Sequence, residues 1–185
     1  MAGPILRLIR RTGRGRFLGA AALSTFYAVW LAAGDSPLRR AREAAGRLPE
    51  LTPGFPSGEP AATLAKLGAA RSDYIWLQAF DAVFAALIAM TALFALALAA
   101  KKPGSAFAAL SSLMLVPISY AVAELIENVL LTLFASGAMA PAPAPVIFQQ
   151  AATTLKLALA GLSVFLIFSV FPMLIGARPR LENSL

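Results

Sequence analysis

Four long apolar blocks constrain the fold of this 185-residue chain more than any other feature of its sequence. They cover residues 17–33, 74–100, 106–135 and 145–176. A helix crosses a hydrocarbon core about 30 Å thick with roughly 20 residues, so each block is close to that length or longer. Only 14% of the residues are charged, whereas soluble domains contain about a quarter. The sequence therefore predicts an all-α integral membrane protein, a four-helix bundle in a single membrane domain.

The first block has features of both a retained span and a secretory signal. Five arginines precede it in the tail 1–16, and the small residues Ala32 and Ala33 end it, as in a cleaved signal peptide. Leu31, however, is bulky where a cleavage site needs a small residue, so we favour a retained span. If the segment is cleaved, three spans remain.

Basic residues between the blocks predict the orientation. The tails 1–16 and 177–185 and the turn 101–105 hold nine Lys and Arg residues against one acidic residue, whereas the loop 34–73 holds six against five. Because cytoplasmic segments carry an excess of Lys and Arg, both termini are predicted to be cytoplasmic. The loops 34–73 and 136–144 are then extracytoplasmic, and we expect a multi-pass protein of the cell inner membrane. This pattern and lipid headgroups explain the net charge of +7, so the expected partners include membrane lipids and not nucleic acid.

The loop 34–73 is the only sizeable segment outside the blocks. Ser36-Pro37 is typical of a helix start, ahead of a basic stretch at 38–47. A turn-rich segment, 49–60, precedes a predicted short helix at 61–70. Such a loop either caps the mouth of the bundle or remains a solvated connector.

Two further features refine the predicted spans. The aromatic residues Trp30, Tyr74 and Trp76 are expected at the outer membrane interface, where amphipathic rings are enriched. Pro117 lies inside the third block and lacks a backbone N–H, so it is predicted to kink that helix.

Four ionisable side chains interrupt the last three blocks: Asp81, Glu124, Glu127 and Lys156. With a helical rise of 1.5 Å per residue, all four lie in one layer about 10 to 16 Å from the outer end of the spans. Because charges are costly in hydrocarbon, we predict that they form one interacting site in the outer half of the bundle. Asn128 shares a helix face with Glu124 and is assigned to the same site. Supporting hydrogen bonds are expected from further polar residues on these faces, namely Gln78, Gln149 and Thr153.

The charge balance of this layer leads to three interpretations. Three carboxylates and one ammonium would leave an unstable negative charge in a low dielectric, so at least one carboxyl should be neutral or compensated. The site either binds or conducts a proton, small cation or polar ligand, or only fixes helix packing in an accessory subunit that meets partner membrane subunits. An intramembrane enzyme acting on lipids, with two carboxyls as acid and base, is the third.

Under the first interpretation, each member of the site has a role. Glu124 and Glu127 would carry exchangeable charge, Asp81 would pair with Lys156, and Asn128 would hydrogen-bond the occupant.

The sequence contains neither Cys nor His, which excludes disulfides, thiol nucleophiles, imidazole bases and ordinary zinc sites. Carboxylates and an Asn carbonyl are ligands for a hard cation, but Lys156 competes for the same negative charge. We therefore expect no cofactor, no resident metal and no catalytic residue, and interpret the chain as a non-enzymatic protein.

Several short motifs occur in a fixed order along the chain. They are the segment 51–57 (Leu-Thr-Pro-Gly-Phe-Pro-Ser), Leu67-Gly68, the segment 71–74 (Arg-Ser-Asp-Tyr), Asp81, the segment 124–128 (Glu-Leu-Ile-Glu-Asn) and Lys156. Together they resemble a widespread family of small four-helix integral membrane proteins with an acidic-x-x-Glu-Asn motif in the third span and a Lys in the fourth. That family usually has Asp where this chain has Glu124. The resemblance covers about residues 50 to 160 and implies that the loop and the intramembrane polar residues form one recurrent design, with the loop covering the site.

Overall fold

The computed structural model describes residues 2–51, 59–102 and 107–175, and every regular element in these ranges is helical. The prediction of an all-α chain is confirmed for these residues. In chain order the elements are α1 (Ala2–Arg11), α2 (Arg14–Ala33), α3 (Pro37–Ala45), the 3₁₀ turn η1 (Pro49–Leu51), α4 (Glu59–Leu67), the 3₁₀ turn η2 (Gly68–Ala70), α5 (Arg71–Ala100), α6 (Phe107–Leu113), α7 (Leu115–Ser136) and α8 (Pro143–Ile175).

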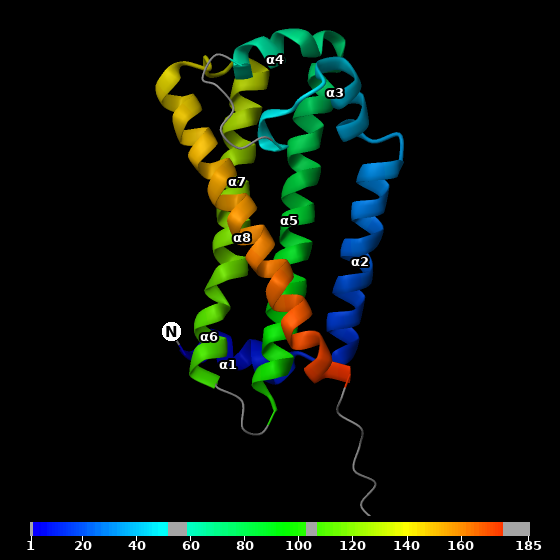
Figure 1. Cartoon of the computed structure of the whole chain (residues 1–185), viewed down its shortest axis with the longest axis vertical. Helices are drawn as coiled ribbons and strands as arrows, with labels where there is room; N and C mark the ends of the chain where they lie inside the picture. Colours follow the sequence, from blue (N-terminus) through cyan, green and yellow to red (C-terminus); the bar gives the residue numbers. More distant parts are fainter. Residues whose placement is uncertain (1, 52–58, 103–106, 176–185) are drawn as a thin grey trace, which may run out of the picture.

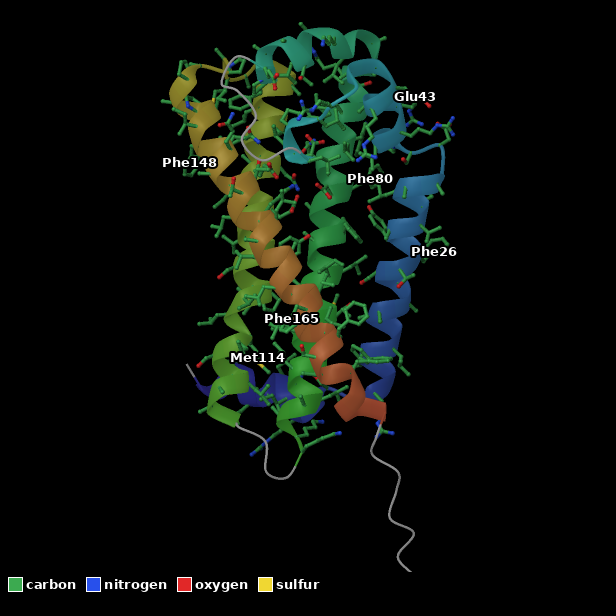
Figure 2. The ribbon with its side chains drawn as sticks, viewed as in Figure 1. Phe26, Glu43, Phe80, Met114, Phe148 and Phe165 are labelled. Carbon is green, nitrogen blue, oxygen red and sulfur yellow. The ribbon has the colours of Figure 1, made fainter. Side chains whose placement is uncertain are left out.

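Four helical segments in the described ranges are long and apolar enough to cross a membrane: Arg14–Ala45, Glu59–Ala100, Ala108–Ser136 and Pro143–Phe171. They stand together along the long axis of the molecule as a helical bundle (Figure 1). Helix α5 is central and packs against α2, α7 and α8. Bulky apolar side chains point outward, as Phe26, Phe148 and Phe165 do in Figure 2. An apolar outer surface of this kind suits lipid rather than water.

One end of the bundle has an apolar core in which alanines of α5 pack among larger apolar side chains. The end of α5, from Ala95 to Ala100, is buried against Phe17 of α2, Leu166 of α8 and Met114, which lies between α6 and α7. Helix α1 runs across this end of the bundle (Figure 1) and buries Ile9 in the same cluster. Small side chains let helix backbones approach closely, which is how helices associate in lipid.

The third predicted span is interrupted. The α-helix stops at Leu113, resumes at Leu115 and is broken at Met114 between them. Pro117 explains the position, because a proline removes the hydrogen bond to the carbonyl four residues earlier and its ring clashes there. The structure thus shows a break between α6 and α7 where a kink was predicted.

Helices α3 and α4 pack on the opposite end of the bundle from α1 (Figure 1). Ser36 starts α3 as expected: its Oγ accepts a hydrogen bond from the Arg39 N–H at 3.3 Å and donates one to the Leu31 carbonyl at 2.7 Å. Leu48 and Leu64 are buried against the ends of α5 and α7. The predicted helix at 61–70 is divided, with α4 ending at Leu67 and η2 leading directly into α5.

Several sequence predictions concern residues outside the described ranges. They include most of the segment 51–57, most of the turn 101–105 and the tail 177–185. The tail 1–16 was expected only as a basic segment, but its residues from Ala2 to Arg11 form α1.

Candidate functional site

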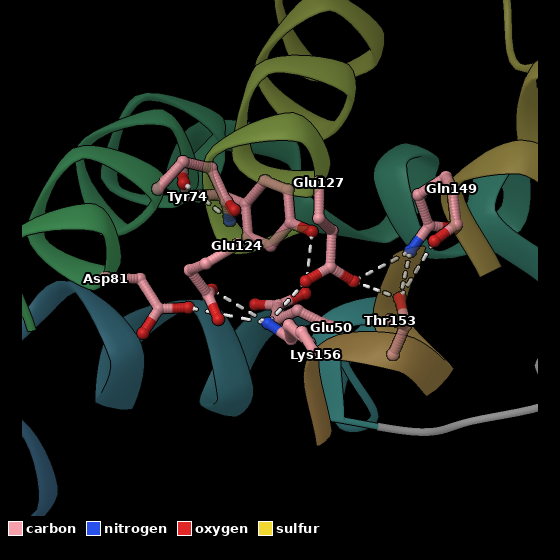
Figure 3. Close-up of polar contacts among 9 residues, drawn as sticks. Glu50, Tyr74, Asp81, Glu124, Glu127, Gln149, Thr153 and Lys156 are labelled. Atoms are coloured by element: carbon pink, nitrogen blue, oxygen red, sulfur yellow. Dashed lines mark hydrogen bonds and ion pairs between the residues drawn. The ribbon is translucent and has the colours of Figure 1, made fainter. Parts of the chain in front are cut away.

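Lys156 lies at the centre of the polar layer and is buried, with 4% of its surface exposed. Its Nζ donates a hydrogen bond to Glu124 Oε1 at 2.9 Å and forms a closer ion pair with Glu127 Oε2. Asp81 Oδ2 lies 3.8 Å from the same nitrogen. Helices α5, α7 and α8 therefore bring the four predicted ionisable side chains together (Figure 3).

Asp81 is the most exposed member of this group. Its side chain is 24% exposed, whereas those of Glu124 and Glu127 are almost fully buried. The expected pairing of Asp81 with Lys156 exists only as the longest of the three ion pairs, because the two glutamates of α7 lie closer to the ammonium. Asp81 thus forms the open edge of the cluster.

Two of the three predicted supporting residues hold Glu127 from α8. Gln149 Nε2 donates a hydrogen bond to Glu127 Oε1 at 3.1 Å, and Thr153 Oγ1 donates to the same oxygen. Gln149 also donates to Thr153 Oγ1 at 2.8 Å. Residues 149, 153 and 156 share one stripe of a helix, so a single face of α8 contributes the lysine and both hydrogen-bonding partners.

Two residues that the sequence did not assign to the site belong to it. Glu50, in η1, is buried with 2% exposure, and Tyr74 donates a hydrogen bond from its hydroxyl to Glu50 Oε2 at 2.8 Å. Tyr74 is fully buried whereas Trp76 is exposed, so the two aromatic residues have different surroundings, and their place at the outer membrane interface stays a prediction. The only sequence signal for Glu50 is that it directly precedes the segment 51–57 of the resemblance.

Burial raises the pKa of the Glu50 carboxyl from its ordinary value of 4.5 to about 7. The Tyr74 hydroxyl and the charge of Lys156 oppose this shift in pKa, while Asp81 adds to it. Glu50 is therefore within electrostatic reach of the cluster and changes charge near neutral pH. Together with Asp81, Glu124, Glu127 and Lys156 it forms what we call the carboxylate–lysine cluster (Figure 3).

Asn128 and Gln78 are buried in the same layer, but Lys156 contacts the three carboxyls and not these amides in the described ranges. Neither the nitrogen nor the oxygen of the Asn128 amide has a hydrogen-bond partner among the described residues. Gln78 Nε2 makes one long hydrogen bond to the Tyr74 carbonyl at 3.4 Å, and its Oε1 has no partner there. The structure thus places Asn128 beside the carboxylate–lysine cluster and not in its network.

The charges of the carboxylate–lysine cluster do not balance. Full ionisation of its four carboxyls and one ammonium would give a net charge of −3, which a buried site cannot hold without protons or cations. Within the described ranges, no group of three or more acidic, His or Cys side chains is arranged to hold a metal ion. The arrangement can chemically accept protons, or accept a small cation in their place.

Comparisons with known proteins return no relative: no family model, no curated protein and no solved structure matches the chain. The resemblance to the family of small four-helix proteins remains a prediction, and the proposals that follow rest on the residues of this chain.

Proposed function

We propose that this chain is a multi-pass protein of the cell inner membrane, with both termini in the cytoplasm and the α3–α4 segment on the outer side. Basic residues from distant parts of the sequence support this orientation. Lys101 donates a hydrogen bond to the Arg10 carbonyl at 3.2 Å, so the basic α1 and the end of α5 meet at one end of the bundle. The α3–α4 segment lies at the other end (Figure 1). The carboxylate–lysine cluster then lies in the outer half of the membrane.

Within this topology, we propose that the carboxylate–lysine cluster takes up and releases protons. The observation that carries the proposal is an excess of carboxyl groups: three contact Lys156, and the buried Glu50 is within its electrostatic reach. A buried carboxylate without a compensating charge is stabilised by protonation. Ionisable groups inside membrane helices typically mark ion or proton pathways.

A proton fits this cluster better than a bound metal ion. The Lys156 ammonium already contacts carboxylates from both α5 and α7, so a metal ion would have to displace it or compete with its charge. A proton needs no additional space and leaves these contacts in place. The alternative positively charged occupant is a small cation that enters at Asp81, the open edge of the cluster.

Glu50 supports an outward connection for these protons. It lies in the segment that covers the outer end, and its pKa of about 7 lets it exchange a proton near neutral pH. Its hydrogen bond to Tyr74 joins that segment to α5, the helix that also carries Asp81. Glu50 is thus the member of the carboxylate–lysine cluster that we expect to meet protons from outside first.

Proton flux in proteoliposomes tests the proposal. The purified protein is reconstituted with a pH-sensitive dye inside the vesicles, and a potassium diffusion potential drives proton entry. Wild-type vesicles should acidify faster than protein-free vesicles, and Glu124→Gln combined with Glu127→Gln should return the rate to the protein-free level. Glu43→Gln is the matched control, because Glu43 is an exposed acid of α3 whose ion pair in the described ranges is with Arg39. Equal flux in the wild type and the double variant would refute the proposal.

One observation favours a second candidate function. Lys156 links α8 to carboxyls on both α5 and α7, so the same cluster fixes the relative rotation of three helices. This would suffice for an accessory subunit of a larger membrane complex. Purification in a mild detergent distinguishes the two functions: a stoichiometric partner together with no proton flux favours the accessory subunit.

A further inference from the structure

A groove of about 370 Å³ opens on the outer surface of the bundle between α5 and α7. Its walls are mostly apolar, and Trp76, Leu125 and Val129 expose about half or more of their surface beside it. Because α5 and α7 belong to candidate membrane spans, the groove opens toward lipid rather than toward water. Its volume lies at the lower end of the range for small-molecule sites.

Two amide side chains line this apolar groove, Gln78 from α5 and Asn128 from α7. Both are more than nine-tenths buried. Within the described ranges, the Asn128 amide has no hydrogen-bond partner for its donor or its acceptor, and Gln78 has none for its oxygen. Buried polar groups in proteins nearly always have partners, so unpaired amides in a groove indicate that a ligand supplies them.

We propose that this groove binds a membrane lipid whose neutral head group carries a free hydroxyl. A hydroxyl both donates and accepts, so it can pair with the oxygen and the nitrogen of Asn128 at once. An ester or ketone only accepts and would leave the amide oxygens unpaired, and an ammonium only donates. An anionic head group is disfavoured because two acidic residues of α7 are close to Asn128: Glu124 lies one turn before it and Glu127 one residue before it.

The hydrocarbon chain of this lipid lies along the apolar walls. Ala79 and Ala82 form the α5 side of the groove, and their small side chains leave the space that the chain fills. The proposal is independent of proton exchange, because neither amide hydrogen-bonds the carboxylate–lysine cluster within the described ranges.

Photolabelling tests the proposal. The protein in liposomes is irradiated with a long-chain alcohol that carries a diazirine on its chain, and labelled peptides are identified by mass spectrometry. We expect label on α5 and α7 peptides that line the groove. Unlabelled alcohol should compete about fivefold better than its methyl ether or the matching fatty acid, as expected for hydrogen bonds made within a membrane.

Two variants separate the parts of the site. Ala79→Phe fills the groove without changing a polar group and should abolish the label, whereas Ala86→Phe, on an exposed face of α5 outside the groove, should not. Asn128→Leu should still bind the hydrocarbon chain and be labelled, but it should lose the preference for alcohol over ether. Gln150→Leu on α8 is its control and should keep that preference.

Three results would overturn the proposal. The first is label that Ala79→Phe leaves unchanged. The second is competition by ether and alcohol with equal strength in the wild type, which would leave an apolar groove without head-group recognition. The third is a crosslinked dimer through groove residues, which would assign the groove to a second copy of this chain.

Discussion

The two halves of the bundle are held together by different chemistry. In the half near α1, helix α5 packs through alanines such as Ala95 and Ala97, which are fully buried. In the half near η1, the same helix contributes Asp81 and Tyr74 to a buried polar network with α7 and α8. Helices α5 and α8 run through both halves, and in the half near α1 they pack through apolar residues. The polar half thus carries three buried carboxyls and the partly exposed Asp81, for which packing has no need, and this difference favours a function there.

Lys156→Met should produce the largest loss of stability, and the loss should come from the polar half alone. Removing the ammonium leaves the three carboxyls that contact it without compensation, and breaking such a buried pair costs about 3 to 5 kcal/mol. The free energy of unfolding in mixed detergent and denaturing surfactant measures this loss. Adding Glu124→Gln and Glu127→Gln should recover most of it. Lys66→Met, at an exposed lysine of α4, is the control and should be neutral.

Glu50→Gln should remove a pH dependence of stability that comes from the polar half. The pKa of Glu50 is about 7 in the folded protein against an ordinary 4.5, so the folded state binds this proton more tightly than the unfolded state. The contribution of Glu50 to stability is therefore complete below about pH 4.5 and falls as pH rises to about 7, by about 3 kcal/mol. Unfolding measured from pH 4 to 8 should show this decline in the wild type. Glu50→Gln should flatten it, and Glu43→Gln should not.

Ala95→Leu should affect only the apolar half. Ala95 is fully buried, and additional methylene groups in a tightly packed core cost about 2 kcal/mol. Stability should fall by that amount, while proton flux per folded molecule should stay at the wild-type level. Ala86→Leu, on an exposed face of the same helix, is the control. A loss of flux without a loss of folded protein would show that the two halves are not separable.

Thr153→Val should have the smallest effect, about 1 kcal/mol, because within a membrane it removes the hydrogen bond to Glu127 and the one accepted from Gln149. Gln149 still donates to Glu127, so the network is weakened and not broken. Thr154→Val is the matched control, since Thr154 is exposed and bonds only the Gln150 carbonyl in the described structure. Equal stability of the two variants would show that Thr153 does not stabilise Glu127.

The sequence predicted the spans and their polar layer because both depend on local rules. Apolar length determines which helices can cross a membrane, and the helical rise places Asp81, Glu124 and Lys156 at one depth. Ser36 as a helix start and the disturbance near Pro117 follow from backbone chemistry of single residues. These parts of the fold need no knowledge of tertiary contacts.

The missed parts depend on how the chain folds back. Glu50 reaches Tyr74 only because η1 returns over the bundle, which no periodicity in the loop indicates. Helix α1 forms against the end of α5 through Ile9, although its sequence is read as a basic tail. Asn128 shares a helix face with Glu124 by spacing, yet it lines the groove between α5 and α7 while Glu124 contacts Lys156. Whether a residue on this face of α7 lines the groove or contacts Lys156 depends on small rotations of the neighbouring helices. Residue spacing alone does not specify these rotations.

The central claim is that the carboxylate–lysine cluster holds exchangeable protons. Infrared spectroscopy of the reconstituted protein tests it most directly, because a protonated carboxyl has a carbonyl stretch distinct from that of a carboxylate. We predict a protonated-carboxyl band at neutral pH that changes with the pH of the outer solution and shrinks in Glu124→Gln combined with Glu127→Gln. Absence of this band at neutral pH, or a band that the double variant leaves unchanged, would contradict the claim.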